Sequence, residues 1–164
     1  MTLADIQLLY EYNYWAKSRL LQSLDSLREE DLSKDLKSSF PSIHATLTHI
    51  IGAEQIWLQR FTGEPPQKFL AVQDVPTYAA AKEKWGHVEH DMISYVQSLT
   101  EDRLRDVFAF KNLKGEPVSQ VRWQALQHLV NHGTYHRGQL TTMIRQIGGT
   151  PPNADLIAFY RQKK

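Results

Sequence analysis

The chain has 164 residues and no cysteine, and its 19 Lys and Arg against 18 Asp and Glu give a formal net charge of +1. This length fits one domain with one core, over residues 1–164. Without cysteine there are no disulfides, thiolate nucleophiles, zinc sites with cysteine ligands or iron–sulfur clusters. Any metal ion must therefore be bound by nitrogen and oxygen atoms.

Charge and hydropathy also limit which partners and which cellular compartment we expect. The near-neutral charge, with no basic stripe interleaved with aromatic residues, predicts no nucleic-acid partner. No apolar run approaches the roughly 20 residues needed to cross a bilayer, and the first residues do not resemble a secretory leader. We therefore expect a cytoplasmic protein with no membrane partner.

Three helices are predicted in the first hundred residues. Apolar residues at steps of three and four indicate an amphipathic helix over residues 2–28. Pro41 and Ser42 can open a second helix, which ends at Gly63. Thr77 is expected to cap a third helix that runs to Leu99.

A short excursion precedes one long helix. Residues 107–119 are typical of a small hairpin, because Gly and Pro interrupt β-prone residues. A helical pattern follows over residues 119–147, and Asn153 is expected to cap a final short helix through Tyr160. The fold class predicted from these elements is all-α: an up-down four-helix bundle with a small extended excursion before the fourth long helix and a short C-terminal helix.

Three of the seven histidines recur at steps of four on the last long helix: His128, His132 and His136. Side chains four apart have Cβ atoms about 5–6 Å from each other, so two such rings can reach one ion at roughly 2.0–2.1 Å. The outer two are about 12 Å apart along the axis, so all three cannot bind the same ion. A third ligand must come from another helix, where the available histidines are His44, His49, His87 and His90.

Other features of these helices bear on the site. His87 and His90 lie among charged residues, which favours a solvated face. Gly133 and Gly138 each cost about 1 kcal/mol relative to alanine inside a helix, so we expect close approach of another helix or of a ligand to offset them. The alternative is that the histidines of the last helix only pack together or face water.

Three segments resemble the DinB/YfiT-like family of DNA-damage-inducible four-helix bundles. They are residues 12–16 (Tyr-Asn-Tyr-Trp-Ala), residues 49–57 and, most specifically, residues 131–139 (Asn-His-Gly-Thr-Tyr-His-Arg-Gly-Gln). In that family a histidine of the second helix and an H-x-x-x-H pair of the last helix bind a divalent ion. The resemblance therefore implies His49, His132 and His136 as metal ligands, with the remaining coordination positions open to water or substrate.

The residues beside these ligands have open roles. His49 points away from the strongest apolar stripe of its helix, whereas Glu54 lies near the middle of that stripe. Glu54 and Asn13 are the candidate catalytic residues. Glu54 could have a functional role, orienting a metal ligand or accepting a proton, or a structural role in an ion pair. Asn13 either lines the site or bonds a neighbouring helix. His128 is expected beside the ligands and not among them.

Three neutral imidazoles leave an ion its full charge and an open position, where water becomes acidic and carbonyl or thiol groups are polarised. The resemblance extends to thiol-dependent transferases and isomerases, which implies a metal-dependent thiol transferase or a hydrolase, with a low-molecular-weight thiol as a second cofactor. Zinc or nickel is the preferred metal. The alternative is a structural ion in a non-catalytic stress-response or binding module. The sequence does not identify the small-molecule substrate. A homodimer is expected by analogy with related bundles.

Overall fold

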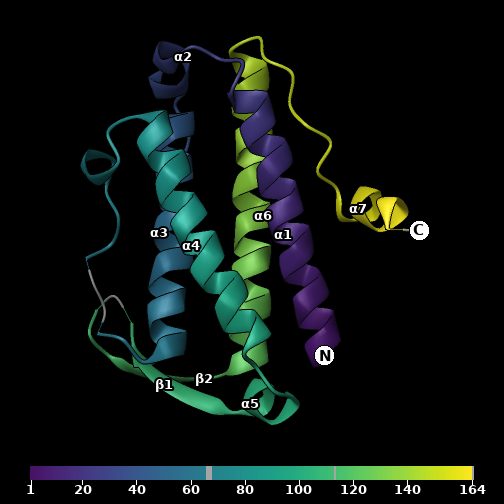
Figure 1. Cartoon of the computed structure of the whole chain (residues 1–164). Helices are drawn as coiled ribbons and strands as arrows, with labels where there is room; N and C mark the ends of the chain where they lie inside the picture. Colours follow the sequence, from purple (N-terminus) through teal and green to yellow (C-terminus); the bar gives the residue numbers. More distant parts are fainter. Residues whose placement is uncertain (66–67, 113, 164) are drawn as a thin grey trace.

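Four long helices dominate the computed structural model, which describes residues 1–65, 68–112 and 114–163 (Figure 1). They are α1 (Leu3–Leu24), α3 (Ile43–Thr62), α4 (Tyr78–Gln97) and α6 (Arg122–Gln146). The shorter elements are α2 (Glu29–Ser33), the 3-10 turn η1 (Val72–Asp74), α5 (Glu101–Arg105), β1 (Val107–Lys111), β2 (Pro117–Val121) and α7 (Leu156–Gln162). The predicted all-α bundle with a small excursion and a short last helix is confirmed.

The long helices form a ring in the order α1, α4, α3, α6. α1 and α4 are antiparallel, since the hydroxyl of Tyr78 at the start of α4 donates to the carbonyl of Leu21 near the end of α1. α3 and α4 are parallel, because His44 in the first turn of α3 bonds the carbonyl of Val75, just before α4 begins. The connection that carries η1 returns the chain to the end at which α3 began (Figure 1). The helices therefore run up, down, down and up, and do not alternate as an up-down bundle would.

Most helix ends lie where the capping residues place them. Ser42 accepts a hydrogen bond from the amide of Ala45, Thr77 accepts one from the amide of Ala80, and Gly63 ends α3 with a φ of 77°. Such side-chain caps satisfy amides that have no partner inside the helix. The sequence patterns therefore predicted the start of α3 and of α4 correctly.

Several helix boundaries differ from the prediction by one or more residues, and three of the differences have a visible cause. α1 ends at Leu24, because residues 29–33 form the separate turn α2 after Arg28 adopts an extended backbone. α6 begins at Arg122, because residues 119–121 pair with β1 in the hairpin. The N-cap of α7 is Asp155 and not Asn153. The side-chain oxygen of Asn153 instead accepts a hydrogen bond from the backbone amide of Asp155.

The core fills the ring between the four helices. Trp85 of α4 is 1% exposed, whereas Trp15, Trp57 and Trp123 are only partly buried. The hairpin closes one end of the bundle, where Phe108 packs on Phe61. Hydrophobic burial at these contacts is the main force holding the helices together.

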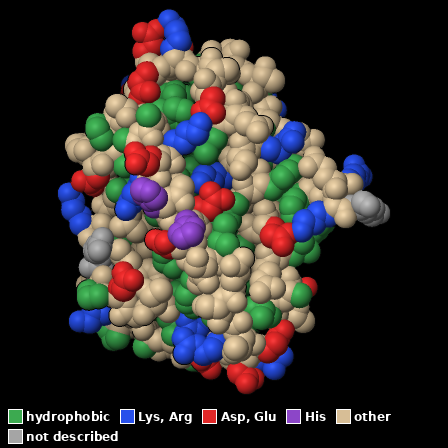
Figure 2. All heavy atoms as spheres, viewed as in Figure 1, with side chains coloured by type: hydrophobic (Ala, Val, Ile, Leu, Met, Phe, Trp, Pro, Cys, Tyr) green, Lys and Arg blue, Asp and Glu red, His purple; other side chains and the backbone are tan. Residues whose placement is uncertain are grey.

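The outer face of α4 is polar. His87 and His90 are exposed, as predicted, and Figure 2 shows histidine side chains among acidic and basic ones over this helix. Across residues 1–65, 68–112 and 114–163, no helix is long and apolar enough to cross a membrane.

Gly52 allows the segment after α3 to lie directly on that helix. A Cβ atom at this position would be 2.8 Å from Cε1 of Phe69 and 3.2 Å from Cβ of Leu70. We expect Gly52→Ala to lower the free energy of unfolding by about 1–3 kcal/mol, because the added carbon overpacks the contact. Urea unfolding measures this change. The matched control is Gly86→Ala in α4. In the described part of the chain no atom beyond the neighbouring helix backbone lies within 4 Å of a Cβ built there, so alanine should stabilise the protein by about 0.5–1 kcal/mol. Equal stabilisation of both variants would contradict the contact at Gly52.

Candidate metal centre

Three imidazole rings from two antiparallel helices converge at one side of the bundle. His49 projects from α3, and His132 and His136 lie one turn apart on α6. The Nε2 atom of His132 is 3.1 Å from Nε2 of His49 and 3.1 Å from Nε2 of His136. Two nitrogen ligands of a tetrahedral ion with bonds of about 2.0–2.1 Å are roughly 3.4 Å apart. Both distances are close to this value and all three ligand atoms lie within 4.8 Å of one another, so the group could hold a divalent ion.

Burial keeps two of these rings neutral. Burial, and to a smaller extent the neighbouring His136, lowers the pKa of His49 to about 4. Burial and the adjacent histidines, His136 first, lower the pKa of His132 to about 4. At neutral pH both imidazoles thus keep a lone pair available for a metal ion.

Gln139 orients one of the rings. The Nδ1 atom of His136 lies 2.7 Å from the Oε1 atom of Gln139. An amide oxygen only accepts, so Nδ1 donates its proton and the Nε2 lone pair faces the other two histidines. His132 differs, because its buried Nδ1 has no hydrogen-bond partner among the described residues. No role for Gln139 was predicted, although its place three residues after His136 is the spacing at which helical side chains meet.

Removing this hydrogen bond should weaken metal binding. We expect Gln139→Leu to reduce zinc affinity about 10- to 100-fold, because the ring of His136 loses the partner that fixes its orientation. Competition with a chromophoric chelator measures the affinity. Gln146→Leu, two turns further along α6 and exposed, is the control and should bind zinc as the unchanged protein does. Equal affinities for the Gln139 variant and the unchanged protein would show that Gln139 does not support the site.

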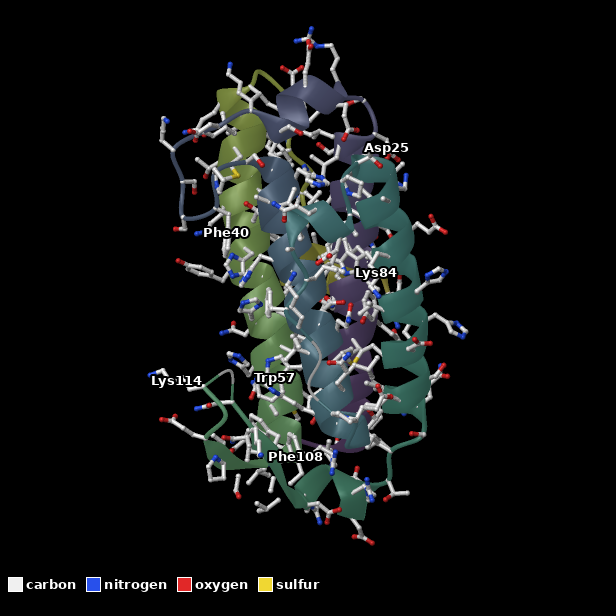
Figure 3. The ribbon with its side chains drawn as sticks, turned by 90° about the vertical axis from the view of Figure 1, so that its left-hand side faces the viewer. Asp25, Phe40, Trp57, Lys84, Phe108 and Lys114 are labelled. Carbon is white, nitrogen blue, oxygen red and sulfur yellow. The ribbon has the colours of Figure 1, made fainter. Side chains whose placement is uncertain are left out.

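Aromatic side chains surround the three rings. Phe40 stacks on His49, with ring centroids 4.2 Å apart, and meets His136 edge-on at 5.6 Å. Phe69 lies 5.6 Å from the ring of His49, and the exposed Tyr135 meets His136 edge-on at 5.0 Å. Figure 3 shows Phe40 beside the α3 and α6 ribbons, with Trp57 further along the same side. The rings cover the nitrogen cluster with apolar surface. None was predicted as part of the site, because two of them come from connections between helices.

The remaining helix histidines are not part of this cluster. His128 is exposed; its ring lies 6.0 Å from that of His132 and 5.6 Å from Trp57. His44 is buried and bonds the carbonyl of Val75 through Nε2. Within the described ranges, the group of His, Asp and Glu side chains that could hold an ion comprises His49, His132 and His136.

Glu54 and Asn13 belong to a separate network inside the bundle. Glu54 is 2% exposed and accepts hydrogen bonds from Asn13 at 3.1 Å, from Trp85 at 3.0 Å and from Tyr14 at 3.4 Å. The Oδ1 atom of Asn13 accepts one from Arg137 at 2.7 Å. Of the two roles expected for Asn13, the structure shows the second: its side chain forms hydrogen bonds to α3 and α6. The side-chain amide of Asn13 links the two charged groups, because it donates to Glu54 and accepts from Arg137. Glu54 lies outside the group of side chains that could hold an ion.

The two glycines of α6 differ. A Cβ at Gly133 would lie 2.9 Å from Nη1 of Arg137 and 3.2 Å from Oδ1 of Asn13, so this glycine makes room for the buried network. That is the close approach expected from the sequence. At Gly138 no described atom beyond the neighbouring helix backbone lies within 4 Å of a built Cβ, so the expected close approach of another helix is not found among the described residues.

The lowered histidine pKa values predict how acid affects the metal-free protein. Between about pH 6.5 and 4 the unfolded chain protonates His49 and His132 at their ordinary pKa of 6.5, but the folded protein does not. The free energy of unfolding should therefore fall as the pH falls through this window and be independent of these groups above it. Thermal unfolding at pH 4–8 tests this. The double variant His49→Gln, His132→Gln should show a shallower slope, and an unchanged slope would contradict the assignment.

Comparison with known proteins relates the whole chain to one family. Residues 2–164 match the profile of the DinB family. The chain is 31% identical to Protein DinB of Bacillus subtilis (strain 168) over 160 residues, which cover 92% of each sequence. It is 25% identical to the uncharacterized protein YizA of the same organism over 150 residues, 90% of this chain and 91% of that one. The crystal structure of a DinB-like protein from Bacillus cereus ATCC 10987 matches with a TM-score of 0.65 at 25% identity, covering 89% of this chain and 94% of that chain.

Proposed function

Because the chain belongs to the DinB family, we propose that it binds one divalent ion, zinc or nickel, through His49, His132 and His136 and is a metal-dependent transferase or hydrolase. The observation that carries this proposal is the convergence of three Nε2 atoms from two helices. The neutral state of His49 and His132 at physiological pH supports it further.

The ligand set favours catalysis over a purely structural role. Structural zinc sites are closed by four protein ligands, whereas catalytic sites have three and one open position. In the described part of the chain the group contains three residues, and both His49 and His132 are only partly buried. A divalent ion held by three imidazoles acts as a Lewis acid, which makes a bound water or thiol more acidic and polarises a carbonyl group.

The protein's own residues hold this centre in place. Gln139 fixes the ring of His136, and Phe40 supports the ring of His49 by stacking. Phe40 and Phe69 exclude water from one side of the cluster, which strengthens electrostatic interactions there. We propose that the substrate approaches past Tyr135, which is 65% exposed at the rim of the site.

An activity screen tests the proposal. Metal-free protein is reloaded with zinc or nickel and assayed for transfer of a low-molecular-weight thiol to a chromogenic electrophile, and for ester and amide hydrolysis. We expect activity that depends on added metal and falls at least 100-fold in His132→Ala. Rates that are the same with and without metal, and the same in His132→Ala, would contradict a catalytic metal.

The second candidate function is a structural ion, and the observation in its favour is that the ligands come from two helices, so that the ion would link α3 to α6. Melting of metal-free protein separates the two. If the ion is catalytic, the metal-free protein should unfold in one cooperative transition, because the core of the bundle is complete without the ion. Loss of cooperative unfolding on metal removal would favour the structural role.

A further inference from the structure

A hollow of about 460 Å³ lies between α6 and the C-terminal segment. One wall is residues 151–155, which run along the side of the bundle away from α3 (Figure 1). The other wall is one face of α6, where residues recur at steps of three and four. This wall is lined by Thr134, Arg137, Gly138, Thr141 and Arg145. The hollow is thus separate from the three histidines, which face α3.

Arg137 brings a buried positive charge to this hollow. It is 5% exposed, and its guanidinium donates to Oδ1 of Asn13 at 2.7 Å and to Oγ1 of Thr134 at 2.8 Å. These partners are neutral, and no described carboxylate forms an ion pair with Arg137. The buried carboxylate of Glu54 is linked to the guanidinium only through the Asn13 amide, and the ring of Tyr12 lies 5.7 Å from the guanidinium carbon. The guanidinium also has more N–H donors than these two bonds use, in a geometry that suits carboxylate and phosphate.

Gly138 leaves the wall of the hollow open. A glycine inside a helix is unfavourable, and at Gly133 of the same helix the reason is contact with Arg137 and Asn13. Apart from the neighbouring backbone of its own helix, no described atom lies within 4 Å of a Cβ built at Gly138. Because Gly138 lines the hollow, a side chain at this position would occupy space that the glycine leaves free for a ligand.

The charge of the lining is positive overall. Arg137 and Arg145 face one acidic residue, Asp155. A second hollow of about 560 Å³ adjoins the first and shares Tyr12 and Thr134 with it. Apolar side chains, amides, hydroxyls and the imidazole of His128 line it, with no Asp, Glu, Lys or Arg among its lining residues. The two together offer a cationic end and a neutral end.

We propose that the hollow between α6 and residues 151–155 binds the carboxylate or phosphate group of a small metabolite. Arg137 and Arg145 supply the positive charge, and the adjoining hollow takes the uncharged remainder of the ligand. This site is independent of the proposed metal centre and of the reaction proposed there.

The test uses metal-free protein and two probes, inorganic phosphate and malonate, at constant ionic strength set with chloride. Amide chemical shifts are followed by two-dimensional NMR. We expect saturable shifts confined to residues 134–145 and 153–155 with at least one probe, and the probe that saturates at the lower concentration identifies the oxyanion. Arg145→Gln should bind that probe at least tenfold more weakly.

Gly138→Leu fills the hollow without removing a charge. It should weaken binding at least tenfold while the protein stays folded, because nothing occupies the space beside Gly138. Gly86→Leu, at an equally open helical glycine of α4, is the matched control and should bind as the unchanged protein does. His132→Ala should also bind normally, which separates this site from the metal centre. Shifts that fail to saturate with both probes, or undiminished binding by Gly138→Leu, would overturn the proposal.

Discussion

Replacing His132 with alanine is expected to abolish stoichiometric binding of zinc or nickel. His132 is the central ring of the cluster, since its Nε2 atom is 3.1 Å from those of both His49 and His136. A change in a residue that only supports a ligand costs about 10- to 100-fold in affinity, so loss of a ligand should cost more than about 100-fold. Metal analysis of purified protein should give one ion per chain before the substitution and almost none after it.

Thermal unfolding provides a second readout of the same substitution. An ion at about 100 times its dissociation constant should stabilise the unchanged protein by about 2.7 kcal/mol, and this gain should be absent in His132→Ala. The control is His128→Ala, one turn earlier on α6 and exposed, which should keep both the ion and the gain. Equal metal content in both variants would show that the ion is bound elsewhere.

Replacing Glu54 with alanine should cause a large loss of stability and leave metal binding intact. The substitution removes the acceptor of the Asn13, Trp85 and Tyr14 hydrogen bonds in the core. Buried donors left without an acceptor, together with the cavity, should lower the free energy of unfolding by about 3–5 kcal/mol. For a chain of this size the melting temperature should fall by about 10 °C.

The controls for Glu54 separate structure from chemistry. Glu83→Ala, at an exposed position of α4, should change the stability by less than about 0.5 kcal/mol. Glu54→Ala should still bind one ion per chain at a temperature where it is folded. A Glu54→Ala protein that keeps its stability but loses the ion would place Glu54 in the metal centre after all.

Local patterns predicted the helices and half of the candidate site. The caps Ser42 and Thr77 and the Gly63 stop each act within one turn, so the sequence was sufficient to place them. The His132 and His136 pair is likewise local, since a helix brings residues four apart onto one face. The directions of the helices were not predictable in this way, because they depend on the connection between α3 and α4.

The other half of the site depends on packing between distant segments. His49 pointed away from the apolar stripe of its helix, and only the family resemblance selected it. The reason is that the three rings meet at the edge between α3 and α6, and not at the centre of the bundle. Glu54 does lie at the centre, and its polar partners there come from α1 and α4. No periodicity within one helix could identify these partners or the aromatic cover from residues 40 and 69.

The most direct measurement is anomalous diffraction from crystals of the metal-loaded protein at the absorption edge of zinc or nickel. We expect one peak about 2.0–2.1 Å from the Nε2 atoms of His49, His132 and His136. A peak bound by other residues, or no peak beside these three rings in protein that contains stoichiometric metal, would contradict it.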